Sequence, residues 1–196
     1  NILTHNVLLP TIGYNRDDGI AIGLTDIFTV SGFERNPFTQ KHTFSAQYFF
    51  ATQGFDGRYE GEFGKFLGLW NGVVALRGTT ENFSQNFFGF GNETANDDDE
   101  LGLDFNRVKI SILSAEAGVK RNYDSGMQLD FRAFFESVEV EDSPNRFITD
   151  VFAENNPFEV FDRKNFVGAK ARLLFESYDN KVSPSRGMRF ELATGY

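Results

Sequence analysis

Residues 127–135 spell Met-Gln-Leu-Asp-Phe-Arg-Ala-Phe-Phe, a run in which apolar and polar side chains alternate, with Phe134 as the one exception. Successive side chains of a β-strand point to opposite faces, so this period of two predicts a strand with one apolar and one charged face. The same alternation returns at 43–50, 58–63, 167–176 and 188–192. The chain is therefore predicted to be all-β.

Turn residues separate nine segments of this kind. Asn, Asp and Gly at 15–19, 53–57 and 124–126, and Pro37 within 34–37, favour hairpin turns. The predicted strands are 6–14, 20–31, 41–52, 57–66, 70–79, 107–123, 127–140, 166–178 and 187–196. Two long connections, 80–106 and 142–164, interrupt the series. We expect sequential antiparallel hairpins, an up-and-down meander.

Segment 107–123 changes its apolar parity along its length. Val108, Ile110 and Ile112 share one parity, whereas Leu113 and Ala115 begin an apolar run of the other parity. A bulge near Ile112 and Leu113 would reconcile the two runs. A helix is the alternative interpretation, but helical spacing leaves no clean apolar stripe in this segment. We expect a strand with a bulge.

Strand length separates two all-β architectures, a soluble sandwich and a membrane barrel. The predicted strands run about ten to fourteen residues, whereas soluble strands usually run about five or six. Ten tilted residues cover roughly 23 Å, close to the apolar band of about 25 Å on a transmembrane barrel. With the first turn placed outside, both long connections also lie outside, as such barrels prefer. The sequence predicts an antiparallel up-and-down transmembrane β-barrel.

Composition excludes several other classes of protein. Hydrophobic residues make up 40% of 196 residues, but 24 are Phe, more ring surface than a globular core requires. No run of about eighteen apolar residues could form a membrane helix, and no leader peptide opens the sequence, so we expect that any signal peptide has been removed. The net charge of −9, from 19 basic and 28 acidic residues, argues against nucleic-acid binding. The absence of Cys removes disulfide and thiol chemistry.

No motif predicts catalysis. His5 and His42 lack metal-ligand spacing, and the acidic run 97–100 lacks the spacing of a calcium loop. The glycines at 89–91 are not followed by the Lys and Ser or Thr of a phosphate cradle, and no serine lies in a GxSxG elbow. We expect no enzymatic activity, cofactor or metal ion.

The polar strand faces carry both signs of charge and are predicted to point into the barrel lumen, because a charge facing lipid at mid-bilayer costs roughly 2–4 kcal/mol. The candidate lumen residues are Arg58, Glu60, Glu62, Asp130, Arg132, Glu136, Lys170, Arg172 and Glu176. Structural pairing between neighbouring strands is one interpretation. A water-filled lumen that opens is the other.

The segment Tyr178-Asp179-Asn180-Lys181-Val182-Ser183-Pro184-Ser185-Arg186-Gly187 resembles a turn of the BamA/TamA superfamily, the bacterial surface antigen barrels. Its motif positions are Asp179, Pro184, Arg186 and Gly187. Residues 86–94 and 9–19 are similar to segments of a subgroup in which the barrel can follow a phosphoesterase-like domain. In that family the turn joins strands eight and nine of sixteen, the place that it has in our strand count.

The resemblance implies that residues 1–196 are the first half of a bacterial outer-membrane barrel, without the family's POTRA domains or an enzymatic domain. It implies a lateral gate at the first strand, with lipid, client barrel proteins and periplasmic or surface lipoproteins as partners. The candidate gate residues are Asn6, Val7, Leu8, Leu9, Pro10, Thr11 and Ile12. Two functions remain: an insertase or translocase for envelope proteins, and an anchor or pore for a fused or associated enzyme domain.

Overall fold

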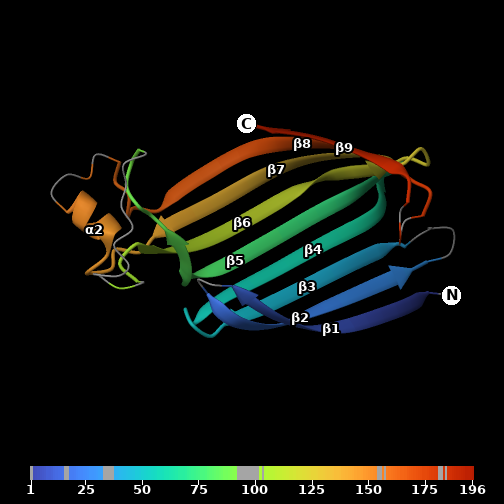
Figure 1. Ribbon diagram of the computed structural model, residues 1–196. Coiled ribbons are helices and arrows are strands. Elements are labelled where there is room, and N and C mark those ends of the chain that lie inside the picture. Colours follow the sequence, from blue (N-terminus) through green and yellow to red (C-terminus); the bar gives the residue numbers. More distant parts are fainter. Residues whose placement is uncertain are drawn as a thin grey trace.

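The computed structural model describes residues 2–15, 18–32, 38–91, 102, 104–153, 156, 158–180, 183 and 185–196. Figure 1 shows one broad, curved sheet with a short helix beyond one end. The strands are β1 (Leu3–Asn15), β2 (Gly19–Ser31), β3 (Gln40–Phe49), β4 (Gly54–Leu67), β5 (Trp70–Asn86), β6 (Arg107–Asn122), β7 (Met127–Val140), β8 (Lys164–Tyr178) and β9 (Gly187–Gly195). The helix is α2 (Phe147–Phe152).

The order of the nine strands in the sheet follows the order of the chain, and every ladder from the β1–β2 pair to the β8–β9 pair is antiparallel. The predicted all-β class and the up-and-down meander are therefore confirmed. The first and last strands form the two margins (Figure 1), and no ladder joins them within the described ranges, so this sheet is not closed.

Most predicted strands agree with the structure to within three residues at each end. The main exception is β5, which runs to Asn86 rather than to residue 79. Its register with β6 shifts between Thr79 and Phe83, so that three residues of β5 face one residue of β6. The turn signals of the sequence do not mark this extension, because the irregular segment continues the ladder instead of ending it.

The register places side chains of one kind on each face of the sheet. One row runs Leu8, Asp26, Phe44, Tyr59, Leu76, Ala115, Phe135 and Val167 across β1 to β8. The adjacent row on the opposite face runs Thr25, Ser45, Arg58, Arg77, Ser114 and Glu136. We call the face that carries Arg58 the charged face and the face that carries Phe135 the apolar face.

The bulge predicted in β6 near Ile112 and Leu113 is wrong. Strand β6 pairs with β7 without interruption from Ile110 to Asn122, so its side chains alternate regularly throughout. The apolar parity changes because Val108 and Ile110, on the charged face, are covered by the cap beside α2, whereas Leu113 lies on the apolar face and is 57% exposed. The apolar parity of β6 therefore changes because different neighbours pack on its two halves, and not because its backbone geometry changes.

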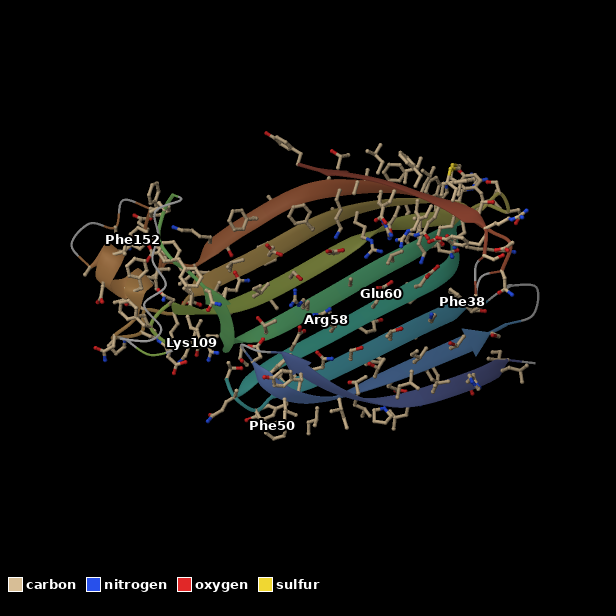
Figure 2. All side chains as sticks on the ribbon, viewed as in Figure 1. Phe38, Phe50, Arg58, Glu60, Lys109 and Phe152 are labelled. Atoms are coloured by element: carbon tan, nitrogen blue, oxygen red, sulfur yellow. The ribbon has the colours of Figure 1, made fainter. Side chains whose placement is uncertain are left out.

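The cap is a small apolar cluster at the end of the sheet where α2 lies. Val108 of β6 packs with Ile148 and Phe152 of α2, and Phe87, Ile110, Val140, Val160 and Phe161 surround them. Figure 2 shows Phe152 at this end, away from Arg58 and Glu60 in the middle of the sheet. The main-chain amide of Phe147 donates to the carbonyl of Phe105, which ties together the two connections predicted to be long. The sequence did not predict this helix. No helix of the described residues is long and apolar enough to cross a membrane.

Phe134, the exception to the alternation of β7, lies on the charged face. It faces Gly168 across the β7–β8 ladder, and a Cβ on Gly168 would lie 2.8 Å from the Phe134 ring. The glycine therefore makes room for the ring, which explains how an aromatic side chain is accommodated among charged neighbours.

Candidate functional site: a charged face and a free first strand

All nine candidate lumen residues lie on the charged face, in strands β4, β7 and β8. Figure 2 shows two of them, Arg58 and Glu60, in the middle of the sheet. The structure joins seven of the nine to basic or acidic partners on the same strand or on strands one or two places away, and these partners belong to the same alternation. The charged face is built from four groups of charges that follow one another across the sheet.

The first group centres on Asp56 of β4. Arg58 Nη2 lies 2.7 Å and Arg77 Nη2 3.1 Å from the same carboxylate oxygen, Asp56 Oδ2. Asp56 is only 2% exposed, so this carboxylate depends on the two guanidinium groups for compensation of its charge. The group connects β4 with β5.

The second group connects β4 with β6 across β5, which contributes Asn71. Lys120 Nζ lies 2.5 Å from Glu62 Oε2, and the Asn71 side-chain amide donates to Glu62 Oε1 at 2.8 Å. The side chains of Lys120 and Glu62 are 14% and 11% exposed, so this ion pair is largely shielded from water. Shielding makes the loss of one partner costly.

The third group connects β6, β7 and β8. Arg132 Nη2 lies 2.7 Å from Asp130 Oδ2, and Arg132 Nη1 lies 3.2 Å from Glu116 Oε2. The other oxygen of Glu116 is 2.5 Å from Lys170 Nζ. Two cations and two carboxylates thus form one chain of ion pairs across three strands.

The fourth group connects β8 with β9 and is more exposed. Arg172 Nε lies 2.7 Å from Glu191 Oε1, and Arg189 lies within 3.4 Å of both Glu176 and Glu191. The side chains in this group are 38–53% exposed, so water and salt screen these pairs and each contributes little to stability.

Glu60 and Glu136 differ from the other seven. Within the described part of the chain neither forms an ion pair, and both line a hollow of about 330 Å³ together with Glu116, Arg58 and Arg77. The structure therefore brings the predicted charges onto one face, but it pairs only seven of the nine.

The charged face becomes uncharged toward β1. In the described residues of β2 its side chains are small, hydroxyl-bearing or apolar, among them Thr25 and Ile27, and in β1 they include Val7 and Leu9. Across the middle of these two strands no ion pair ties one strand to the next in the described ranges. The margin at β1 is therefore held by its backbone ladder and by uncharged contacts.

The candidate gate residues all lie in β1, an edge strand of the sheet. They pair on one side with β2, from Asn6 opposite Phe28 to Ile12 opposite Ile22. On the other side no strand of the described ranges pairs with them. Leu8 is 60% exposed and Ile12 84%, which leaves apolar side chains as well as backbone groups available at this edge.

The turn after β8 is organised by the Asp179 carboxylate. Asp179 Oδ1 accepts hydrogen bonds from the main-chain amides of Asn180, Ser185 and Arg186, and Oδ2 accepts one from the Ser185 hydroxyl. The Ser185 hydroxyl, followed by the Arg186 amide, lowers the pKa of Asp179 to about 2. Pro184 lies outside the described residues.

Gly187 has a steric role in the same turn. A Cβ at this position would lie 2.4 Å from Tyr178 Cδ1 and 2.5 Å from the carbonyl oxygen of Ser177. Since one of these atoms belongs to the backbone, no larger residue fits without a shift of the strand. Local geometry thus accounts for Asp179 and Gly187, two of the four predicted motif positions of this turn.

The apolar face has a basic and aromatic cluster at the turn end of β5 and β6. The Arg121 guanidinium carbon lies 5.9 Å from the ring centre of Trp70 and 4.5 Å from that of Tyr123. Trp70 also lies 5.9 Å from Phe131. Amphipathic rings with a cation at one edge of an apolar belt are typical of a membrane–water interface.

Six charged members of the four groups on the charged face were not among the residues predicted from the sequence: Asp56, Arg77, Glu116, Lys120, Arg189 and Glu191. They follow the same period of two as the residues that were selected, so the alternation could have found them. What the sequence alone does not give is the register that joins Asp56 to Arg77 and Glu62 to Lys120, since those pairs are 21 and 58 positions apart in the chain.

His5 and His42 were predicted to be ordinary strand residues, and the described residues contain no group of three or more His, Cys, Asp or Glu side chains that could hold a metal ion. Comparison of the chain with models of known protein families and with curated proteins finds no match.

Proposed function

We propose that this chain forms nine strands of a bacterial outer-membrane β-barrel that assists the insertion or translocation of envelope proteins. In this proposal the apolar face contacts lipid and the charged face lines the lumen. Further strands, from this protein or a partner, would close the barrel between β1 and β9. The first strand would be the edge on which client strands pair.

The observation that carries the membrane proposal is the segregation of side chains between the two faces. Leu8, Phe44, Leu76, Phe135 and Val167 share one row of the apolar face, and each is 38–78% exposed in the open sheet. A water-exposed face with this many large apolar side chains would be an aggregation hazard, whereas lipid would cover it without cost. Strands of 9–17 residues are long enough to cross the hydrocarbon layer.

Trp70 provides the test, because it is the only tryptophan of the chain. Reconstituted into vesicles, the protein should show blue-shifted Trp70 emission and quenching by phospholipids brominated near the headgroup. As the control, a Phe134→Trp, Trp70→Phe variant reports from the charged face and should escape lipid quenching. Emission from Trp70 that only aqueous iodide quenches would refute the membrane placement.

The insertase role is supported by the free margin of β1. An open strand edge is a template for β-augmentation, and Pro10 removes one backbone donor from this strand. A cysteine at Leu8 should form disulfides in intact cells with single-cysteine variants of client barrel proteins. A cysteine at Leu129, in a strand paired on both sides, should not.

The second candidate is an anchor or pore for an enzyme domain, and the ion pairs of β4 to β9 favour it. A charged face whose groups compensate one another forms a rigid wall and requires no client. If Leu8→Cys captures only the last strand of its own barrel, the edge is permanently closed and this second candidate replaces the first.

A further inference from the structure

Asp26 lies on the apolar face, in the middle of β2. It faces Leu8 on one side and Phe44 on the other, and its neighbours along the same face of β2 are Leu24 and Phe28. The other charged residues that the register places on this face, Lys109, Arg121 and Glu139, each lie within three residues of a strand end. Asp26 is thus the one carboxylate in the interior of the apolar face among the described residues.

The carboxylate of Asp26 has no hydrogen-bond or ion-pair partner among the described residues. Its Oδ1 is buried and has no hydrogen bond to any described group. A polar atom shielded in this way is costly unless a donor reaches it, and ionisable residues on membrane-spanning elements usually pair with a second ionisable or donor group. Since Oδ1 is enclosed by atoms of its own chain, Oδ2 is the oxygen that a donor from outside the barrel wall can reach.

A suitable donor lies on the same face of the adjacent strand. His42 of β3 pairs with Phe28, two positions along β2 from Asp26. His42 Nδ1 is 2.9 Å from the hydroxyl of Tyr59, whereas His42 Nε2 has only a 3.4 Å contact with Gln40 at the exposed side. When the Tyr59 hydroxyl donates to Nδ1, Nε2 carries the proton and can donate to a carboxylate.

In the proposed barrel, Asp26 and His42 come to lie at nearly the same height along the axis. Val30, Gln40 and Phe63 share one row of the sheet. In β2 and β3 this row lies within one residue of a strand end, whereas in β4 it lies four residues from the end. Each row therefore rises along the axis from β2 toward β4. For strands tilted about 40°, the step along the row from Asp26 to Phe44 rises by about 3 Å. The two residues along β3 from Phe44 to His42 then descend by about 5 Å. His42 therefore lies about 2 Å below Asp26.

We propose that the apolar face of β2 and β3 is a dimer interface, and that Asp26 of one copy accepts a hydrogen bond from His42 of a second copy. A two-fold axis along the membrane normal, between β2 and β3, places β2 of each copy opposite β3 of the other and leaves the height of every residue unchanged. An acceptor and a donor at equal height on adjacent strands therefore meet twice, once on each side of the axis. This inference goes beyond the proposed function and rests on its membrane placement.

The second copy fits this face better than an unrelated partner because the chain supplies both halves of the contact. The donor is also held in place: the His42 ring lies 5.6 Å from Phe63 and 6.0 Å from Tyr59, ring centre to ring centre, in addition to its bond to the Tyr59 hydroxyl. Phe28 adds a third ring at 6.2 Å. A ring held in this way loses little conformational freedom when it donates across an interface.

Disulfide trapping between two differently tagged copies tests the pairing, since the chain has no native Cys. In cells that produce an Asp26→Cys copy and a His42→Cys copy together, a mixed covalent dimer should form. The control variant Val167→Cys, on the same face of β8 and 78% exposed, should give no mixed dimer with either copy.

Exchange of the two residues provides a rescue experiment. Asp26→Leu should convert the dimer of the purified full-length protein to monomer, and the double variant Asp26→His, His42→Asp should restore it, because the exchanged residues still meet across the axis. Absence of the mixed disulfide, equal trapping at Val167→Cys, or trapping of Asp26→Cys only by another protein would each overturn the inference. Trp70 quenching by lipid is independent of these outcomes, so loss of the dimer with quenching retained refutes the interface and leaves the membrane proposal standing.

Discussion

Substitution of arginine for Phe131 separates the two faces of the sheet. Phe131 is on the apolar face of β7, 45% exposed, with its ring centre 5.9 Å from that of Trp70. An arginine facing lipid costs roughly 2–4 kcal/mol at mid-bilayer and roughly 0–1 kcal/mol near the interfaces, so roughly 1–3 kcal/mol applies at Phe131, which lies between mid-bilayer and the Trp70 ring. Loss of the ring contact adds about 0.5–1.5 kcal/mol. The expected decrease in the free energy of unfolding is therefore about 1.5–4.5 kcal/mol, the sum of these two costs.

Two control variants isolate the lipid contribution. Phe131→Leu removes the ring contact without introducing a charge and should cost only about 0.5–1.5 kcal/mol. Gln128→Arg places the same charge on the opposite face of the same strand, three positions away, and should change stability by about 0.5 kcal/mol or less. Leu173→Arg, on the apolar face of β8 opposite Leu129, should repeat the large loss.

The assay is equilibrium unfolding by urea in phospholipid vesicles, followed by Trp70 emission and checked by the heat-modifiable migration of folded barrels on gels. Equal stability of the Phe131→Arg and Gln128→Arg variants would show that the apolar face meets water in the folded protein. That result would remove the membrane proposal and favour a sheet packed in some other way.

Two further predictions concern the charged face and the turn after β8. Glu62→Gln should lower the free energy of unfolding by about 3 kcal/mol, because it leaves the shielded Lys120 ammonium without its carboxylate. Glu60→Gln, at an unpaired position, is the matched control. This control variant should have little effect in the same urea titration. Asp179 has its pKa lowered to about 2, so its contribution to stability is complete above the unfolded value near 3.8 and is lost as the pH falls through about 2. The protection factors of the amides in residues 178–187, in which the intrinsic exchange rate at each pH is divided by the measured rate, should fall in the native protein between pH 5 and pH 2 and should be low at both pH values in Asp179→Ala; equal protection of the two proteins at pH 5 would contradict this role.

The sequence predicted the strands well because their signal is local. In β7, Leu129, Phe131 and Ala133 alternate with Gln128, Asp130 and Arg132, and a strand is the one regular structure that puts such residues on opposite faces. Turn chemistry, as at Asp124-Ser125-Gly126, then fixed most boundaries. Both signals depend on near neighbours in the chain, so no knowledge of the tertiary structure was required.

The sequence prediction failed where a distant segment changes the environment of a strand. The parity change at Ile112 and Leu113 suggested a bulge, but α2, about 35 positions later, covers Val108 and makes an apolar residue acceptable on the charged face. The short helix itself was missed for the same reason, because Ile148 and Phe152 are buried only against β6 and its neighbours.

The candidate site divides in the same manner between sequence and tertiary structure. Sequence alternation alone determined that Arg58 and Glu62 share one face of their strand and that Arg132 lies opposite the apolar side of its own strand, because a period of two is a property of the isolated strand. Only the tertiary structure decided that Lys120 compensates Glu62 and that Asp26 Oδ1 has no hydrogen-bond partner among the described residues, because charge compensation depends on which strands are adjacent and in which register. Backbone hydrogen bonds between strands are nearly independent of the side chains that they carry, so the register is selected by the packing of the whole sheet and not by any one segment.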